Sequence, residues 1–175
     1  MDRPEVLFKM SVKITILMGI SGSGKSTFVK DTVQNICSTD KFVEEIGSER
    51  GLNYSESFEF IQAQNKFGEI TKRFYNEIED NIKNGNDFVI DRTNLTKESR
   101  ASLMRELRLM GDLYKQEVFI EGIAFNPDLV TIMYRLEKRM KEEHKEIPED
   151  VIARQVVAFE IPADDEGFDV LVIRK

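Results

Sequence analysis

Hydrophobic residues along the chain gather into five short runs, separated by segments with helical spacing. The runs lie at residues 12–18, 36–39, 87–91, 116–125 and 168–173, and they are rich in the β-branched and aromatic residues that strands favour. We expect a strand at each, with an interruption at Gly122 in the fourth. Apolar strands that alternate with helices predict an α/β fold, a five-stranded parallel sheet with helices on both faces.

The segments between the runs place apolar residues at steps of three and four, the spacing of one helix face. Residues 40–55 are the exception, because they are acidic and turn-like and predict an irregular or partly helical segment. The predicted helices are one from the glycine-rich turn after residue 18 to about Asn35, a long one from Glu56 to Asn84-Gly85, one capped by Thr96 and ended by Gly111, one opened by Asn126-Pro127 and one opened by Ile147-Pro148.

The composition of the chain excludes several classes of protein. The 175 residues predict a single domain, 1–175, and 41% hydrophobic with 33% charged residues exclude a disordered chain. No apolar run approaches the ~20 residues of a membrane span, and residues 1–10 are too polar for a signal peptide. Cys37 is the single cysteine, so an internal disulfide is excluded and a reducing, cytoplasmic location is expected.

The clearest motif follows the first apolar run. It is the phosphate-binding loop, or P-loop, pattern G-x-x-x-x-G-K-[ST]. This pattern is matched by Gly19-Ile20-Ser21-Gly22-Ser23-Gly24-Lys25-Ser26, and Thr27 comes next. The glycines let backbone amides turn inward around a phosphate, and the following helix adds its positive end. Lys25 is expected on the β- and γ-phosphates, and the Ser26 hydroxyl on Mg²⁺. We therefore expect residues 19–27 to bind ATP with Mg²⁺.

Two further observations separate the classes of P-loop protein. The length leaves little room for the coupling apparatus of a motor ATPase. A GTPase would need a guanine-reading Asn-Lys-x-Asp, but Asn65-Lys66 continues as Phe67-Gly68. A small kinase is the leading class, and a nucleotide-binding switch module that phosphorylates nothing is the alternative from another class.

Three segments beyond the P-loop complete a family pattern: Ser38-Thr39-Asp40, Val89 to Thr96 with Asp-x-Thr-Asn inside it, and Tyr134 to Arg139. With them the chain resembles the P-loop kinases related to the 5′-kinase domain of phage polynucleotide kinases, within the zeta-toxin-like group. The resemblance covers most of the chain. It implies a P-loop kinase fold with a helical lid at about residues 131–147.

The resemblance also implies roles for individual residues. Asp40 corresponds to the general base that takes the proton of the acceptor hydroxyl, a role suited to a carboxylate. Arg139 corresponds to the arginine that stabilises charge on the transferring phosphoryl group, with Arg135 as a helper. The residues implied around the acceptor and the P-loop are Asp91, Arg92, Thr93 and Asn94. The family arginine that helps to hold an acceptor phosphate falls at Val43, a departure from the pattern.

Plainer roles remain open for the same residues. Asp40 is suited to cap a helix, and Asp91 and Asn94 are suited to form a turn. Arg135 and Arg139 lie four apart, so on a helix they share a face that can pair with Glu142 and Glu143. Two roles, stacking on a base of the acceptor or packing in the core, remain open for four aromatic residues: Phe42, Tyr54, Phe58 and Phe60.

Charge bears on the acceptor. The net charge of −7 excludes tight binding to nucleic acid through bulk charge, so a nucleic-acid acceptor needs a local basic groove. Residues 92–108 carry five basic and two acidic side chains, and residues 131–145 carry five basic and three acidic side chains. This distribution permits a nucleic-acid acceptor without selecting one, and the resemblance implies the 5′-OH of a polynucleotide, DNA or RNA, as the acceptor. Alternatives are a hydroxymethylated base in DNA and a small-molecule hydroxyl.

Overall fold

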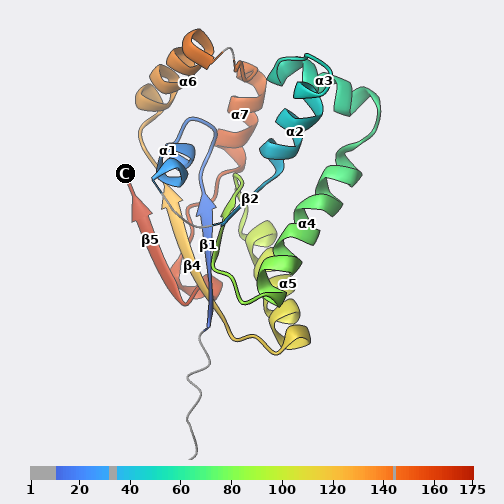
Figure 1. The fold of residues 1–175 in the computed structure, drawn as a ribbon. Coiled ribbons are helices and arrows are strands. Elements are labelled where there is room, and N and C mark those ends of the chain that lie inside the picture. The colour runs from blue at the N-terminus through green and yellow to red at the C-terminus, as the bar shows by residue number, and fades with distance from the viewer. Residues whose placement is uncertain (1–10, 32–34, 144) are drawn as a thin grey trace, which may run out of the picture.

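The computed structural model describes residues 11–31, 35–143 and 145–175 (Figure 1). Its strands are β1 (Val12–Met18), β2 (Asn35–Ser38), β3 (Phe88–Asp91), β4 (Val118–Phe125) and β5 (Val170–Arg174). Its helices are α1 (Lys25–Lys30), α2 (Thr39–Ser48), α3 (Tyr54–Ala63), α4 (Phe67–Lys83), α5 (Lys97–Tyr114), α6 (Leu129–Glu143), α7 (Glu149–Ala158) and the short 3-10 helix η1 (Asp164–Glu166). The polar stretch 1–10 lies outside the described residues, as do residues 32–34 of the predicted first helix.

The five strands form one parallel sheet in the order β2-β3-β1-β4-β5, which confirms the predicted architecture. β1 is central, and Ile16 in it is in register with Ile90 of β3 on one side and Gly122 of β4 on the other. The chain therefore leaves β1 toward one edge of the sheet and later returns to build the other. Ligands of such sheets bind at this switch point, beyond the carboxyl end of the central strand.

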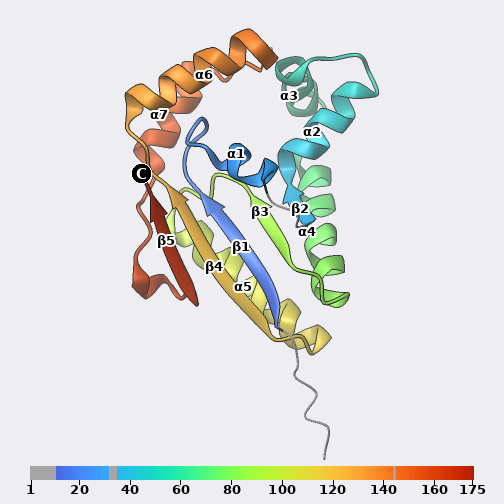
Figure 2. The ribbon, with the colours of Figure 1, turned by 60° about the vertical axis from the view of Figure 1, so that its left-hand side comes forward.

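The two faces of the sheet are covered unequally. Helices α4 and α5 cover one face, where Ile14 and Ile16 pack in a large core with Phe74 and Leu107. The short α1 covers part of the other face, where Val29 packs with Leu17 and other strand residues (Figure 2). Within the part of the chain that is described, no helix combines the length and apolar character needed to cross a bilayer.

The long helix predicted from Glu56 to Asn84 is wrong, because the structure has two helices there. α3 starts two residues earlier, behind a capping box in which Asn53 and Glu56 bond each other's backbone N–H groups. The helical conformation is interrupted at residues 64–66, where Asn65 has a φ of 51°. A left-handed residue cannot continue a helix, so α4 starts anew and changes direction.

Two other predicted boundaries differ from the structure. Residues 40–55 are partly helical, one of the two predicted forms, but the helix α2 starts at Thr39, occupies 39–48 and buries Phe42 against the core. Gly111 does not end α5, which runs on to Tyr114. A Cβ at Gly111 would lie 2.9 Å from the backbone oxygen of Gln116, so this glycine is needed for close packing and not as a stop.

The predictions around β4 need similar correction. The strand is continuous through Gly122, where a Cβ would lie 2.8 Å from the Phe168 ring, so the glycine makes room for that ring. Asn126-Pro127 precedes the helix start and does not form it. Asp128 is the capping residue of α6, because its carboxylate accepts hydrogen bonds from both the backbone N–H and the hydroxyl of Thr131.

Candidate active site

The P-loop joins β1 to α1 at the switch point of the sheet. Gly19, Gly22 and Gly24 all have positive φ, at 141°, 80° and 111°, conformations that side chains disfavour. Ser26 and Thr27 are exposed in the first turn of α1. The predicted phosphate loop therefore has the backbone that its glycines were expected to allow.

Lys25 is folded against this loop. Its Nζ donates to the carbonyl oxygens of Gly19 at 2.7 Å and Ile20 at 2.9 Å, and the residue is 7% exposed. Burial lowers the pKa of Lys25 to about 8, although the nearby carboxylates of Asp91 and Asp40 oppose that shift. Both carboxylates thus lie close enough to act on the P-loop lysine.

Two helices contact the P-loop: α6, which lies in the predicted lid, and α7, which follows it; the two are together called the lid below. Arg135 of α6 donates from Nη1 to the Ser23 carbonyl at 2.9 Å, and α6 also packs Leu136 against Gly22. From α7, the Gln155 side chain accepts a hydrogen bond of 2.8 Å from the Ser21 backbone N–H. The predicted helper Arg135 thus contacts the loop itself, and Gln155 is a contact that no sequence motif indicates.

The predicted acceptor segment Asp91 to Asn94 divides into two parts. Asn94 is buried, has a φ of 43° and donates from its amide to the Leu17 carbonyl at 2.7 Å. The Thr93 carbonyl accepts from the Gly19 N–H at 2.9 Å. These two residues therefore brace the P-loop, and Asn94 takes the turn role that the sequence left open.

Asp91 and Arg92 occupy a different position, at the carboxyl end of β3. Burial raises the pKa of Asp91, whereas the charge of Lys25 opposes the rise. Arg92 is exposed, and its guanidinium lies 5.0 Å from the Phe74 ring centroid. Asp91 is the residue of the segment that couples to the P-loop lysine.

Asp40 lies in the first turn of α2, at the edge of the same site. It is not the helix cap, since the helix starts at Thr39 behind Ser38. The Tyr54 hydroxyl donates to Asp40 Oδ1 at 3.1 Å, and the Nζ of Lys145 lies 3.6 Å from Oδ2. Burial and the Asp40 carboxylate raise the pKa of Tyr54, so its hydroxyl stays a donor. The Asp40 side chain is 56% exposed and remains accessible to an acceptor.

Arg139 approaches the site from α6. Its Nε donates to Glu143 at 2.9 Å, the helix pairing that the sequence left open. Its charge also acts on Lys25 and Asp91. Val43, where the family pattern has an arginine, is 3% exposed and packs in the core. That position of α2 is buried in the core and offers no cation to an acceptor.

Among the described residues, most basic side chains of the two positively charged segments are engaged by partners within the protein. Three of the five basic residues in 92–108 pair with acidic residues of the segment that leads to β5, as Lys97–Asp165, Arg100–Glu166 and Arg108–Asp169. Those in 131–145 are paired as Lys138–Glu142, Arg139–Glu143, Lys141–Glu137 and Lys145–Glu44, while Arg135 holds the P-loop. Most of the positive charge counted in these two segments is therefore neutralised by acidic residues that are distant in sequence or one helical turn away.

Arg100 is the most buried of these cations, with no exposed side-chain area. It forms two hydrogen bonds to Glu166, at 2.6 and 2.7 Å, and others to the carbonyls of Asn94, Leu95 and Glu160. Burial opposes ionisation of Glu166, but Arg100 holds its pKa below the usual value. This pair ties the loop after β3, and with it the P-loop brace, to the segment that follows α7.

Arg100→Met is expected to destabilise the fold by about 3–5 kcal/mol, because it leaves the buried Glu166 carboxylate without its cationic partner. For a chain of this size the loss corresponds to a melting temperature lower by roughly 10 °C. Calorimetry measures it, and the double variant Arg100→Met/Glu166→Gln should recover part of the loss. A single variant that melts with the wild type would show that the pair contributes nothing to stability.

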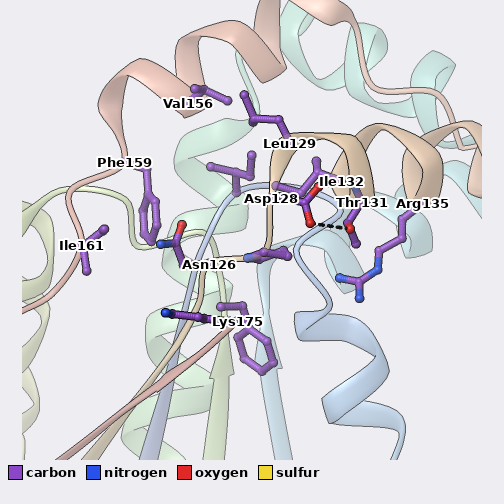
Figure 3. Close-up of a pocket in the computed structure, with 13 residues that line it drawn as sticks. Asn126, Asp128, Leu129, Thr131, Ile132, Arg135, Val156, Phe159, Ile161 and Lys175 are labelled. Atoms are coloured by element: carbon purple, nitrogen blue, oxygen red, sulfur yellow. Dashed lines mark hydrogen bonds between the residues drawn. The ribbon is translucent and has the colours of Figure 1, made fainter.

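A cavity of about 800 Å³ adjoins the P-loop (Figure 3). Ile20 and Arg135 line it on the P-loop side, Asn126 and Thr131 at the start of α6, and Phe159 at the end of α7. The figure shows the Asn126 amide and the Phe159 ring on the same side of this space. The cavity is large enough for a nucleoside and mixes apolar walls with a few polar groups.

The residues at the P-loop fit Mg²⁺. Among the described residues no group of three His, Cys, Asp or Glu side chains is arranged to hold a metal ion. A P-loop site does not need one, because Mg²⁺ is held there through phosphate oxygens, water and one or two protein oxygens. The exposed hydroxyl of Ser26 and the carboxylate of Asp91 are the protein oxygens suited to that role.

The lowered pKa of Lys25 leads to a prediction of how the affinity for nucleotide changes with pH. Its pKa of about 8 in the free protein means that its charge is present below pH 8 and is lost as the pH rises further. A bound triphosphate stabilises the charged form, so binding near pH 8 should take up a proton. Calorimetric titration with ATP in buffers of different ionisation enthalpy measures this uptake, and affinity should fall between pH 7 and pH 9.5. Equal proton uptake by Lys25→Met would contradict the assignment.

The strand order, the P-loop and the helical lid define a protein of the P-loop kinase type. The AAA_33 family, an AAA domain, matches residues 14–162. The chain therefore belongs to the AAA_33 family. The comparison with curated protein sequences found no match.

Three of the matching solved structures illustrate the shared fold. A Chloroflexus aurantiacus protein described as a candidate kinase has a TM-score of 0.65 at 12% identity, covering 94% of this chain and 89% of that one. A fungal RNA kinase has a TM-score of 0.57 at 15% identity, covering 94% and 74%. A sugar kinase from Janibacter sp. HTCC2649 has a TM-score of 0.52 at 16% identity, covering 93% and 84%. At these identities the likeness supports the fold alone.

Proposed function

We propose that this protein transfers the γ-phosphoryl group of ATP to a hydroxyl, with the 5′-OH of a polynucleotide as the first acceptor and Asp40 as general base. One observation carries the proposal. Asp40, Asp91 and Arg139, from three different elements, all lie near enough to act on the charge of the P-loop lysine Lys25. A purely nucleotide-binding switch would not need the exposed carboxylate of Asp40 at this place.

The reaction needs little covalent work from the protein, so positioning and charge account for most of it. The P-loop amides and Lys25 hold the phosphates, and Arg139 neutralises charge that develops on the transferring group. Asp40 accepts a hydrogen bond from the acceptor hydroxyl, orients its oxygen toward the γ-phosphorus and takes its proton. Mg²⁺, when bound at Ser26 and Asp91, supplies further positive charge to the phosphate oxygens.

The cavity beside the P-loop accommodates the rest of the nucleotide in this proposal. It opens next to Ile20 and Arg135, and Arg135 itself contacts the loop through Ser23. A nucleoside attached to phosphates on the P-loop can reach this space, where the Asn126 amide offers both a donor and an acceptor.

The polynucleotide acceptor rests on the family pattern and on the fold shared with a fungal RNA kinase. Two observations favour a second candidate, a hydroxyl with no phosphate beside it, on a hydroxymethylated base or a small molecule. Val43 is buried where the family pattern has its phosphate-holding arginine. Three of the basic residues around the site, Arg135, Arg139 and Lys145, are also engaged with acidic partners or with the P-loop.

Transfer of labelled γ-phosphate from ATP to a panel of acceptors tests the proposal. The panel contains 5′-OH DNA, 5′-OH RNA, duplex DNA with hydroxymethylated pyrimidines, nucleosides and sugars. Label on 5′-OH oligonucleotides supports the first acceptor. Label confined to the hydroxymethylated duplex or to small molecules establishes the second candidate. Binding of ATP without transfer of label to any acceptor would contradict the kinase proposal and favour the nucleotide-binding switch module.

A further inference from the structure

Lys145 has surroundings unlike those of the other cations on the lid. It lies in the loop between α6 and α7, yet it is only 6% exposed. Its Nζ lies 3.7 Å from the centroid of the Tyr54 ring and 2.9 Å from Glu44 Oε1, besides 3.6 Å from Asp40 Oδ2. A lysine that is buried on an aromatic face between two carboxylates gains much more from its contacts than an exposed ion pair does.

The backbone beside Lys145 is docked at the same place. The Ser55 hydroxyl at the start of α3 donates to the Glu146 carbonyl at 3.3 Å. Figure 2 shows α6 reaching from the side of β4 across to α3, above the P-loop and α1. At the other end of the lid, Arg135 and Gln155 hold the P-loop. The lid therefore connects the nucleotide side of the site to the α2–α3 pair that carries Asp40.

The contacts also fix the Asp40 carboxylate. Tyr54 donates to one of its oxygens and Lys145 approaches the other, so the group is held from two sides while more than half of it stays exposed. Tyr54 in turn is held by the Lys145 ammonium on its ring. Removing the ammonium would free both the tyrosine and the carboxylate.

We propose that Lys145 is a positioning residue: it latches the lid onto α2 and α3 through Glu44 and Tyr54 and, together with Tyr54, orients Asp40 for the acceptor. The inference rests on the proposed function, since Asp40 is the base only in that account. It adds that the carboxylate is held in position only when the lid is docked. Proton abstraction is thereby tied to closure of the lid over the nucleotide.

Lys145→Met tests the latch, because methionine keeps the length of the side chain and its contact with the Tyr54 ring but loses the charge. We expect kcat to fall on the order of tenfold, a part of what a general base contributes, with the KM for ATP within about twofold. Lys145→Arg should restore most of kcat, since a guanidinium can stack on Tyr54 and pair with Glu44. Lys141→Met is the matched control: it removes the same charge from the exposed Lys141–Glu137 pair of the same lid and should leave kcat unchanged.

Amide hydrogen exchange of residues 146–152 gives a readout that does not depend on turnover. Exchange should rise in Lys145→Met and in Glu44→Gln, and the double variant should exchange no faster than Lys145→Met, because that variant already removes the contact with Glu44. Lys141→Met should match the wild type.

An unchanged kcat, a loss of kcat that Lys145→Arg does not rescue, or exchange equal to that of the wild type would each overturn the latch. If the wild type phosphorylates no acceptor, the proposed function fails, whereas the exchange comparison still decides whether Lys145 docks the lid.

Discussion

Asp40→Asn is expected to reduce phosphoryl transfer about 10²- to 10⁴-fold, the usual contribution of a general base. The amide is isosteric and can still accept from Tyr54, but it cannot take the acceptor proton. Because Asp40 lies on α2 and not in the P-loop, the affinity for ATP should stay within a few-fold of the wild type. Single-turnover transfer and equilibrium binding of ATP measure the two quantities separately.

Glu49→Gln is the control for this substitution. It removes one carboxylate just after α2, where Glu49 is 72% exposed and pairs with Arg50, outside the set of charges that act on Lys25. Transfer by this variant should equal that of the wild type. If Asp40→Asn retains more than about a tenth of the wild-type rate, another group takes the proton and the assignment of the base is wrong.

Arg139→Gln is expected to lower kcat about 10³-fold or more, within the range that a catalytic arginine contributes to phosphoryl transfer. Its guanidinium lies near Lys25 and Asp91 and is 26% exposed, so it can turn from Glu143 toward the phosphates. The effect should fall on kcat more than on KM, because the charge that it neutralises develops in the transition state. Steady-state kinetics with varied ATP gives this division.

Arg154→Gln is the matched control on the other lid helix. Arg154 is 73% exposed and pairs with Asp150 one turn away. A solvated pair of this kind contributes little, so its removal should leave kcat unchanged. Equal losses in both arginine variants would mean that lid charge in general, and not the position of Arg139, supports the reaction.

The P-loop and the order of elements could be predicted from the sequence because their signals are local. Residues 19–26 combine the motif with a strand before it, and β1, β3 and β4 are apolar runs of the right length. Helix ends were harder, because they depend on single backbone conformations. Asn65 adopts a left-handed conformation within a stretch whose apolar spacing continues on both sides.

The contacts around the candidate base could not be predicted, because they join residues far apart in the chain. Lys145 meets Glu44 across 101 positions, and Arg100 meets Glu166 across 66. Charge counts along the sequence placed both cations in basic segments near the site. In the folded protein Arg100 supports the loop after β3, and Lys145 supports the lid.

Transfer of labelled γ-phosphate by the wild type and by Asp40→Asn, side by side on the acceptor panel, tests the central claim most directly. The account predicts label on a hydroxyl acceptor with the wild type, almost none with the variant, and equal ATP binding by both. Transfer at the same rate by both proteins, or by neither, would contradict it.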